Sequence, residues 1–526
     1  MPLLGPPAPS PHPLDQLLDL GLASAADQPA LISADAQLSW RELDGRATEL
    51  ARRYRALGLL SGDRVASLLP NRLDAFLHLI ACLRAGLVAT PLNYRYRAPE
   101  IDHALTVSGA RWLLFHRERQ EDVDHCERLG DLDLGLFSYD DAVDGRLDQQ
   151  LPSPGAAEPG ATTLAPQAPA LIFFTSGSTG PPKGVTHSRA SLSALLNTYA
   201  RNFVCSAADR FLIGSSVAHI AGLVGGLSGL NLGSQVIVAR STDSAELALL
   251  LERLRPTLLK LLPSALFALV RDPAVPADAF TSLRGCIASG DHIPHELHEE
   301  LQARAGLPIL ELYAMTEAGI LAANPPGREP RRGSVGPAAL GVELELRDDD
   351  GRPVPAGTPG DLWVRTAASM GGYWGNPEAT AEVLSEGWLA TGDELRADTD
   401  GFLWFVGRRK QLIIHDSSNI SPQEVEDALL DHPAVAQAGV VGVHDLVHGE
   451  IVRGYVVMRT QASGSPPSAA ALIAFARKRV GYKAPEQIVV LETMPLNASG
   501  KVDRLALKAL AGNAGEEPRQ PGSPRR

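Results

Sequence analysis

The chain has 526 residues, which is too long for a single hydrophobic core, so we expect two or more domains. Its composition, 44% hydrophobic and 21% charged, is that of an ordinary soluble globular protein. The net charge of −13 argues against nucleic acid or an anionic membrane surface as the main partner. Four scattered cysteines without a CxxC pair argue against a disulfide framework or a zinc site, and they suit a cytoplasmic protein. The apolar runs all fall short of the about 18 residues that a membrane span needs.

From about residue 60, the pattern alternates between strands and helices. The run "RVASLLP" (64–70) predicts a buried strand, and "DAFLHLIACLRAG" (74–86) predicts a helix that stops at a glycine. The alternation continues with the strand "LVATPLN", the helix "APEIDHALTVSGA" with Pro99 in its first turn, and the strand "RWLLFH". It resumes from "RFLIGSS" to "PILELY". Such alternation predicts an α/β fold with largely parallel, helix-covered sheets and with ligands at the carboxyl ends of the strands.

The texture changes after about residue 333. Turn-linked strands follow, with Asp350-Gly351 as a hairpin signal, and they indicate a small β-rich subdomain. Residues of about 410–510 mix helices and strands, as in a small α+β domain. The predicted organisation is therefore a disordered lead-in at 1–25, an N-terminal domain at 26–407, a C-terminal domain at 408–512 and a disordered tail at 513–526.

The stretch "TSGSTGPPKG" (175–184) follows the apolar run "ALIFF" and predicts a loop that binds phosphate. It is not the G-x-x-x-x-G-K-[ST] loop, because Pro182 stands where that pattern needs glycine and "KGVTHS" after it predicts a strand rather than a helix. Its glycines allow backbone N–H groups to turn toward an anion, its hydroxyls donate hydrogen bonds, and its lysine adds a positive charge. The residues concerned are Thr175, Ser176, Gly177, Ser178, Thr179, Gly180 and Lys183. On composition alone, a flexible surface turn is the alternative.

The order of these residues resembles the signature loop of the adenylate-forming superfamily, which contains acyl-CoA synthetases, peptide-synthetase adenylation domains and luciferases. Further motifs follow in the family's order: "YAMTE" (313–317), the stretch 372–393 that ends in "TGD", "GRRK" (407–410), "NISPQEVE" (419–426) and "NASGKVDR" (497–504). The resemblance covers roughly residues 30–510 and is closest to an acid–CoA ligase.

The resemblance implies two half-reactions that use ATP, Mg²⁺ and CoA. A carboxylate attacks the α-phosphorus of ATP to give an acyl-adenylate and pyrophosphate, and a thiol then displaces AMP. Preorganised positive charge is needed because the first step brings two anions together. Lys501 matches the lysine that bridges the carboxylate and the α-phosphate, Thr316 contacts the α-phosphate and Glu317 binds Mg²⁺. Taken alone, Lys501 would be interpreted as a solvated loop lysine, and it is the surrounding motif "SGKVDR" that favours the catalytic role.

Other positions match the nucleotide site, the hinge and the acyl pocket of the family. Asp393 matches the aspartate that accepts hydrogen bonds from the ribose, Arg408 matches a second ribose or phosphate contact, and Lys410 lies at the hinge between the domains. His219, and more weakly Gly222, match the acyl pocket, although a capped core histidine is the alternative for His219. The adenine is expected against Gly290, Asp291, His292, Tyr313 and Ala314.

Three histidines in "HIPHELH" (292–298) resemble a zinc site only superficially, because the spacing after the glutamate is one residue too short. The loop after the hinge departs from the family: Asp416 and Ser417 stand where many acyl-CoA synthetases have two glycines. This departure leaves open whether the thiol belongs to CoA or to a separate carrier protein. A fatty or other apolar acid is expected as the substrate. A luciferase-like oxidase and a non-catalytic nucleotide-binding homologue are the remaining alternatives.

Overall fold

The computed structural model describes residues 14–140, 147, 151, 153, 164–175, 182–290, 293, 295–324, 326–327, 330–408, 411, 413–415, 418–445, 449–459, 466–497 and 500–513. The chain divides into two compact units. The first comprises Met1–Thr358, Leu362–Thr391 and Ala397–Trp404, and the second comprises Pro359–Asp361, Gly392–Arg396 and Phe405–Arg526. Within the described residues, every helix is too short or too polar to cross a bilayer.

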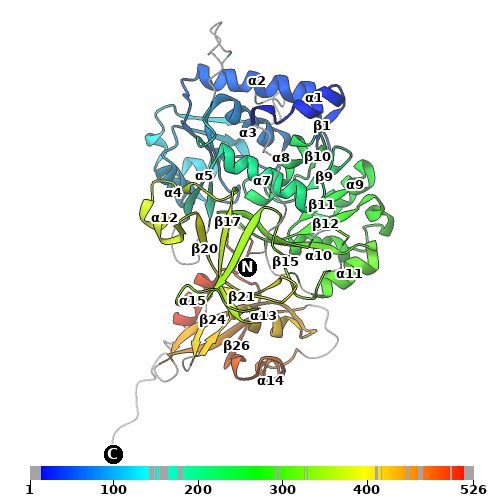
Figure 1. The fold of residues 1–526 in the computed structure, drawn as a ribbon, viewed down its shortest axis with the longest axis vertical. Coiled ribbons are helices and arrows are strands. Elements are labelled where there is room, and N and C mark those ends of the chain that lie inside the picture. The colour runs from blue at the N-terminus through cyan, green and yellow to red at the C-terminus, as the bar shows by residue number, and fades with distance from the viewer. Residues whose placement is uncertain are drawn as a thin grey trace, which may run out of the picture. The chain divides into compact units, whose positions relative to one another are not determined.

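An eight-stranded sheet forms one layer of the first unit (Figure 1). Its central strands pair in parallel and only its two edge pairs are antiparallel, as the alternation of strands and helices predicts. The strands in spatial order are β14 (Gly319–Ala323), β13 (Ile309–Met315), β12 (Gly285–Ala288), β11 (Leu258–Leu261), β9 (Arg210–Ile213), β10 (Gln235–Val238), β1 (Pro29–Ile32) and β2 (Gln37–Ser39).

One face of this sheet carries a large apolar core under three helices. These are α9 (Ser244–Leu254), α10 (Pro263–Arg271) and α11 (His295–Ala305), whose buried leucines pack on Leu259 and Leu261 of β11. Figure 1 shows these three helices along one side of the strands. The opposite face is covered by α8 (Ile220–Asn231), where a Cβ added to Gly225 would lie 3.2 Å from Ile213 Cδ1. Burial on both faces explains why the central strands are continuous apolar runs.

A seven-stranded sheet forms the second layer. Its interior is again parallel, and an antiparallel hairpin and a short strand close one edge. The strands in spatial order are β18 (Gly372–Tyr373), β8 (Lys183–Ser188), β7 (Pro169–Thr175), β4 (Val88–Pro91), β3 (Arg64–Leu68), β5 (Trp112–His116) and β6 (Leu136–Tyr139).

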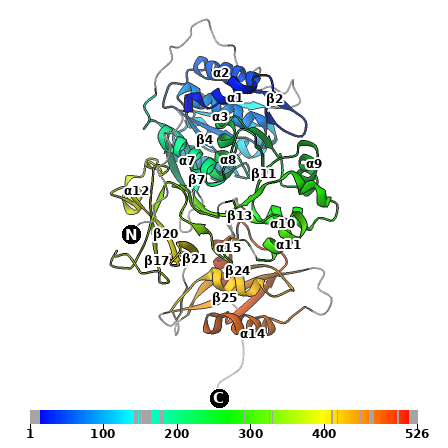
Figure 2. The same ribbon diagram turned by 45° about the vertical axis from the view of Figure 1, so that its right-hand side comes forward.

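The helices of this layer are α2 (Trp40–Ala56), α3 (Leu73–Ala85), α4 (Ala98–Ser108), α5 (Gln120–Asp124) and α7 (Arg189–Asn202). Figure 2 shows α7 beside α8, between strands of the two large sheets. Two sequence predictions are confirmed here. Helix α3 ends at Gly86, whose φ of 73° needs glycine, and α4 has Pro99 in its first turn.

A six-stranded, turn-rich sheet confirms the change of texture after residue 333. It contains β15 (Gly336–Pro337), β21 (Phe402–Arg408), β20 (Trp388–Ala397), β17 (Pro359–Thr366) and β16 (Val342–Arg347), with β19 (Leu384–Ser385) on β20 and the short helix α12 (Pro377–Val383) nearby in the chain. The Asp350-Gly351 turn is present: Gly351 has φ 78°, and Arg347 bridges to Pro353.

The second unit has its own five-stranded sheet and its own apolar core. The strands are β23 (Ser418–Ile420), β22 (Ile413–His415), β25 (Gly449–Met458) and β24 (Val435–Asp445), with β26 (Gln487–Leu491) parallel to β25. The helices are α13 (Pro422–Leu430), α14 (Ala469–Val480) and α15 (Arg504–Asn513). The long segment of this unit begins at Phe405, whereas the predicted domain boundary lies at 408.

The prediction of a disordered lead-in over residues 1–25 is wrong for its second half. Leu14–Gln16 form a 3₁₀ turn and Asp19–Ala25 form α1. The reason is apolar packing: Leu17 and Leu18 are 3% and 1% exposed. Gly21 also allows a close approach, since a Cβ there would lie 2.2 Å from Trp40 Cδ2. Residues 1–13, most of residues 141–163 and the tail from 514 lie outside the described residues.

One buried ion pair connects three elements of the second unit. Glu426 of α13 is 4% exposed and accepts hydrogen bonds from the Val440 amide at 2.7 Å and from Arg504 Nη2 at 2.6 Å. The carboxylate therefore joins α13, β24 and the start of α15.

We expect Glu426→Ala to lower the free energy of unfolding of the second unit by about 3 kcal/mol, because a guanidinium and a buried amide lose their acceptor. Urea denaturation measures the change, and faster hydrogen exchange at Val440 locates it. The exposed Glu492→Ala is the matched control and should change stability by less than about 0.5 kcal/mol. Equal effects of the two substitutions would contradict the role of Glu426.

Candidate active site

The predicted phosphate loop connects the two strands of a hairpin. Thr175 ends β7, Lys183 begins β8, and the two residues are direct partners in the antiparallel register. The strand predicted for "KGVTHS" is thus confirmed, and it distinguishes this loop from one that opens a helix. Ser176, Gly177, Ser178, Thr179 and Gly180 lie outside the described residues. The structure therefore establishes the two ends of the loop and places them side by side.

The exit of the loop is held by a histidine that sequence reasoning missed. His103 of α4 makes a hydrogen bond from Nε2 to the carbonyl oxygen of Pro182 at 2.7 Å. Because a carbonyl only accepts, Nε2 carries the proton. The ring also packs edge-to-face on Phe174, with the ring centroids 6.4 Å apart. Only the fold could identify His103, since it lies about 80 residues before the loop, in a helix to which the sequence assigned no role in the site.

A cation, an aromatic ring and a carboxylate are connected next to this loop. Lys183 Nζ lies 4.8 Å from the centroid of the Tyr373 ring, within the range of a cation–π interaction. The Tyr373 hydroxyl donates to Glu317 Oε1 at 3.1 Å. Burial, followed by the charge of Glu317, raises the pKa of Tyr373, so the phenol remains a donor. Tyr373 stood inside a quoted motif, but the sequence suggested no role for it.

Strand pairing explains why these side chains meet. Residues 372 and 373 form β18, which adds to β8 with Tyr373 opposite Val185, two residues from Lys183. The Trp374 amide donates to the Gly184 carbonyl at 2.7 Å and extends this contact. Segments that are almost 190 residues apart are therefore fastened by backbone hydrogen bonds.

The backbone of Thr316 and Glu317 is held from two sides. The Met370 amide donates to the Glu317 carbonyl at 2.7 Å, and His187 Nε2 donates to the Thr316 carbonyl at 2.8 Å. His187 is completely buried, and burial lowers its pKa to about 4, so it stays neutral. The two residues predicted to contact the α-phosphate and Mg²⁺ therefore follow β13 in a rigid arrangement.

The donor chemistry around Glu317 fits Mg²⁺. Among the described residues, no group of three or more His, Cys, Asp and Glu side chains could hold a metal ion. Mg²⁺ does not need such a cage, because it is usually bound by one or two carboxylates together with phosphate oxygens and water. Glu317 supplies such a carboxylate beside the predicted phosphate loop.

The segments predicted to contact adenine lie at the carboxyl ends of neighbouring strands. Gly290 follows β12, and Tyr313 and Ala314 belong to β13; Ala288 and Glu311 are partners in the register of the two strands. Gly290 has a φ of 101°, which a side chain would strain. Asp291 and His292 lie outside the described residues. The end of a parallel sheet is where ligands bind in such folds.

The two residues predicted for the acyl pocket are near each other at the start of α8. His219 is the N-cap residue of this helix, and its Nε2 lies 3.3 Å from Asn93 Nδ2. A Cβ at Gly222 would lie 2.3 Å from the carbonyl oxygen of Ser216. This close approach explains Gly222 by packing. The role of both residues in the acyl pocket stays a prediction.

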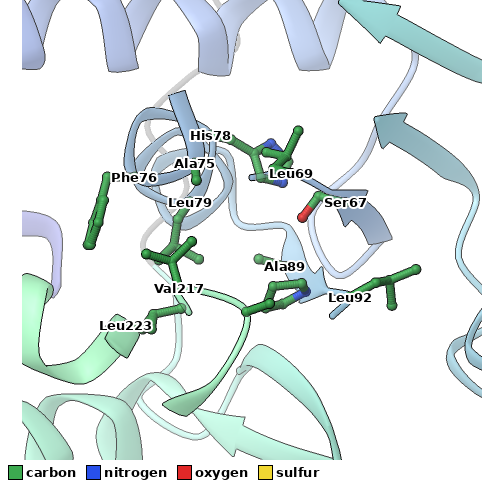
Figure 3. A pocket seen from close by; sticks show the side chains of 12 residues that line it. Ser67, Leu69, Ala75, Phe76, His78, Leu79, Ala89, Leu92, Val217 and Leu223 are labelled. Atoms are coloured by element: carbon green, nitrogen blue, oxygen red, sulfur yellow. The ribbon is translucent and has the colours of Figure 1, made fainter. Parts of the chain in front are cut away.

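A small apolar cavity lies near this segment (Figure 3). Phe76 and Leu79 of α3 line one side, and Val217 and Leu223 line another. The cavity is lined mainly by apolar side chains and has room for about one water molecule.

In the second unit, Asp393 of β20 and Arg408 of β21 form an ion pair. Arg408 Nε donates to Asp393 Oδ1 at 3.0 Å. The side chain of Asp393 is 5% exposed, whereas that of Arg408 is 47% exposed. A buried carboxylate with a defined orientation suits the predicted acceptance of ribose hydroxyls.

Lys501 lies in a tight turn that closes on itself. Its amide donates to Asn497 Oδ1 at 3.1 Å, and the Asn497 amide donates to the Lys501 carbonyl at 2.8 Å. Gly500 supports the turn with a φ of 84°. A bridge between Leu496 and Val502 closes the base of the turn. The predicted hinge residue Lys410, and Asp416 and Ser417 after it, lie outside the described residues.

Comparison with known proteins identifies the family of this chain. The AMP-binding enzyme family matches residues 21–374, and the AMP-binding enzyme C-terminal domain matches residues 424–501. A feruloyl-CoA synthase from Amycolatopsis sp is 35% identical over 471 residues, which cover 88% of this chain and 92% of that protein. A sulfoacetate–CoA ligase from Cupriavidus necator is 33% identical over 502 residues, covering 94% and 97%. The fatty acid–[acyl-carrier-protein] ligase ScoC from Streptomyces coeruleorubidus is 32% identical over 492 residues, covering 91% and 93%.

The fold is also that of a solved relative. The crystal structure of ATP-bound MatB from Rhodopseudomonas palustris superimposes on this chain with a TM-score of 0.86, at 26% sequence identity. The superposition covers 96% of this chain and 100% of that chain. The predicted α/β class, with a large N-terminal domain and a small C-terminal one, is confirmed. The chain belongs to the AMP-binding enzyme family of adenylate-forming enzymes.

Proposed function

We propose that this AMP-forming acid–CoA ligase activates a carboxylic acid with a largely apolar body and transfers the acyl group to CoA. The observation that carries the proposal is the connected set Lys183, Tyr373 and Glu317 beside the hairpin loop. It combines a phosphate-binding cation with a carboxylate for Mg²⁺, as the first half-reaction requires. ATP, Mg²⁺ and CoA are the cosubstrates and cofactor of this class of enzyme.

In the first half-reaction, a carboxylate oxygen of the acid attacks the α-phosphorus of ATP, and the bond to the leaving pyrophosphate breaks. Lys183 binds the β- and γ-phosphates together with the hairpin loop, and Thr316 positions the α-phosphate. Glu317 holds Mg²⁺, which neutralises phosphate charge. Lys501 compensates the charge that brings carboxylate and phosphate together. Asp393 and Arg408 orient the ribose.

In the second half-reaction, a thiol attacks the acyl carbon and AMP leaves. The hinge at Lys410 lets the small domain exchange the arrangement that serves adenylation for the one that serves thiol attack. Lys501 therefore acts in the first half-reaction only.

Apolar side chains support an apolar body for the acid. Val217, Ala218 and Leu223 flank His219 at the start of α8, and all three are buried. The relatives named above act on acids as different as ferulate, sulfoacetate and fatty acids, so their names leave the body of the acid open. A pyrophosphate-release screen over aliphatic, aryl and dicarboxylic acids would identify it.

A reducing compartment suits the cysteines of the chain. All four are free thiols, and burial raises the pKa of Cys286 to about 12, which keeps that thiol unreactive. The cytoplasm is the location that we propose on this basis.

We expect Tyr373→Phe to weaken the use of Mg²⁺ about tenfold, because Glu317 loses the hydrogen bond that orients its carboxylate while the ring beneath Lys183 remains. Pyrophosphate release measured against Mg²⁺ concentration should show a higher midpoint. Tyr482→Phe is the matched control, since Tyr482 is 64% exposed. Identical Mg²⁺ midpoints for the two variants would contradict this role of Tyr373.

Lys501→Ala should lower the rate of acid-dependent pyrophosphate release at least about 100-fold, because the charge that offsets carboxylate and phosphate repulsion is lost. ATP binding, followed by calorimetry, should remain measurable. Lys508→Ala, an exposed lysine of α15, should retain the full rate. Unimpaired adenylation in the Lys501 variant would refute the assignment.

Incubation of the enzyme with ATP, Mg²⁺ and an accepted acid should yield acyl-CoA when CoA is added, as detected by mass spectrometry. The alternative acceptor is the phosphopantetheine thiol of a separate carrier protein. This alternative is supported by Asp416 and Ser417 in place of two glycines and by the similarity to ScoC. Acyl-adenylate that accumulates with CoA but disappears with a phosphopantetheinylated carrier protein would favour this alternative.

A further inference from the structure

A lysine is buried in the middle of the eight-stranded sheet. Lys260 of β11 is 2% exposed and is the one charged residue in the strand "LLKL". In the part of the chain that the structure describes, no Asp or Glu forms an ion pair with it, and its ammonium donates to Ser289 Oγ. A buried charge without a compensating partner is costly, so an ammonium at this position needs an explanation.

The strand register defines the face to which Lys260 points. Leu259 and Leu261 belong to the core beneath α9, α10 and α11, and successive side chains of a strand point to opposite faces. Lys260 therefore points to the face that α8 covers, together with Ile213, its partner on β9. Figure 1 shows β9, β11 and β12 as neighbouring strands of the eight-stranded sheet.

Two further buried polar atoms near β9 have no partner among the described residues. Ser215 is 3% exposed, and its Oγ has no hydrogen-bond partner among the described residues. Ser215 follows Ile213 by two residues in the chain. Tyr199 of α7 is likewise 3% exposed with an unpaired hydroxyl. A Cβ at Gly225 would lie 3.4 Å from this hydroxyl and 3.2 Å from Ile213 Cδ1, which places the hydroxyl near the same strand.

The ammonium of Lys260 and the hydroxyl of Ser289, joined by their hydrogen bond, form what we call the polar cluster. Ser215 and Ser289 follow the carboxyl ends of β9 and β12, on either side of β11. The chain after Ser215 leads to His219, and the chain after Ser289 begins with Gly290. The polar cluster therefore lies between the segment expected to bind the acyl group and the segment expected to bind adenine.

We propose that the polar cluster binds a second anionic group of the acid, remote from the carboxylate that is adenylated. The preferred substrates then have an apolar body that ends in a second carboxylate or a sulfonate. An ammonium beside a hydroxyl is suited to such a group, and the anion supplies the charge compensation that the described protein groups do not. This inference rests on the proposed ligase function and specifies its substrate class.

The lysine environment supports the inference. Burial lowers the pKa of Lys260 to about 7, so the site holds its positive charge weakly in the absence of an anion. Binding of an anion favours the charged form of a neighbouring amine. The bound anion of the substrate thus offsets the free-energy cost of burying the charged lysine.

Matched pairs of acids test the proposal. Pyrophosphate release is measured with hexanoate against adipate and with butyrate against succinate, and the ratio of kcat/KM for the dianionic over the monoanionic acid is the readout. We expect the unmodified enzyme to prefer the dianionic acid of each pair. Lys260→Met should lower this ratio about 30-fold, because a buried charge pair is lost. Lys508→Met should leave the ratio unchanged.

Lys260→Met is expected to fold, since methionine replaces the buried charge with an apolar chain of similar length. Ser289→Ala provides a milder variant and should lower the ratio about threefold, because the hydroxyl beside the ammonium is lost. A preference for monoanionic acids, or a ratio that Lys260→Met does not change, would overturn the proposal and leave the ligase function intact. Absence of pyrophosphate release with every acid would instead contradict the ligase function.

Discussion

The antiparallel pairing at the edge of the seven-stranded sheet is the constraint on which the candidate active site depends. Strand β8 pairs with β7 on one side and with β18 on the other, so the hairpin loop and Tyr373 are fastened to the same strand. Lys183 and Glu317 then share Tyr373, one through its ring and the other through its hydroxyl. Backbone hydrogen bonds thereby fasten the segments that carry the cation predicted to bind phosphate and the carboxylate predicted to bind Mg²⁺. Such preorganisation is what stabilisation of a charged transition state requires.

Buried charges in this protein have different supports. Glu426 is paired with Arg504 and with a backbone amide, so its charge is compensated inside the second unit. Lys260 has a hydroxyl partner and no ion pair among the described residues. The pairing of Glu426 is typical of a structural ion pair. A buried charge without an ion pair, as at Lys260, is typical of a ligand-binding site. Histidines contribute in a third way: His187 and His103 act as donors to backbone carbonyls that hold the site segments.

Sequence patterns predicted the local structure well where apolar spacing was regular. Helix α3, with its glycine stop, and the strands from β3 to β5 lie where the periodicity placed them. The error at residues 14–25 has a simple cause. Leu14, Leu17 and Leu18 are too few to show a period, and the segment is ordered by the burial of these leucines and by the close approach of Gly21 to Trp40. Tertiary packing, rather than local preference, orders that segment.

By itself, the sequence determined the family, the α/β class and the chemical groups available for adenylation, because short motifs with strict residue order carry that information. The tertiary structure alone decided which of these groups meet. Tyr373, His103 and His187 contact site residues that are about 56 to 130 positions away, and no spacing in a single sequence encodes such contacts. The orientation of Lys260 likewise follows from strand register, since alternation along β11 has a meaning only when the faces of the sheet are known.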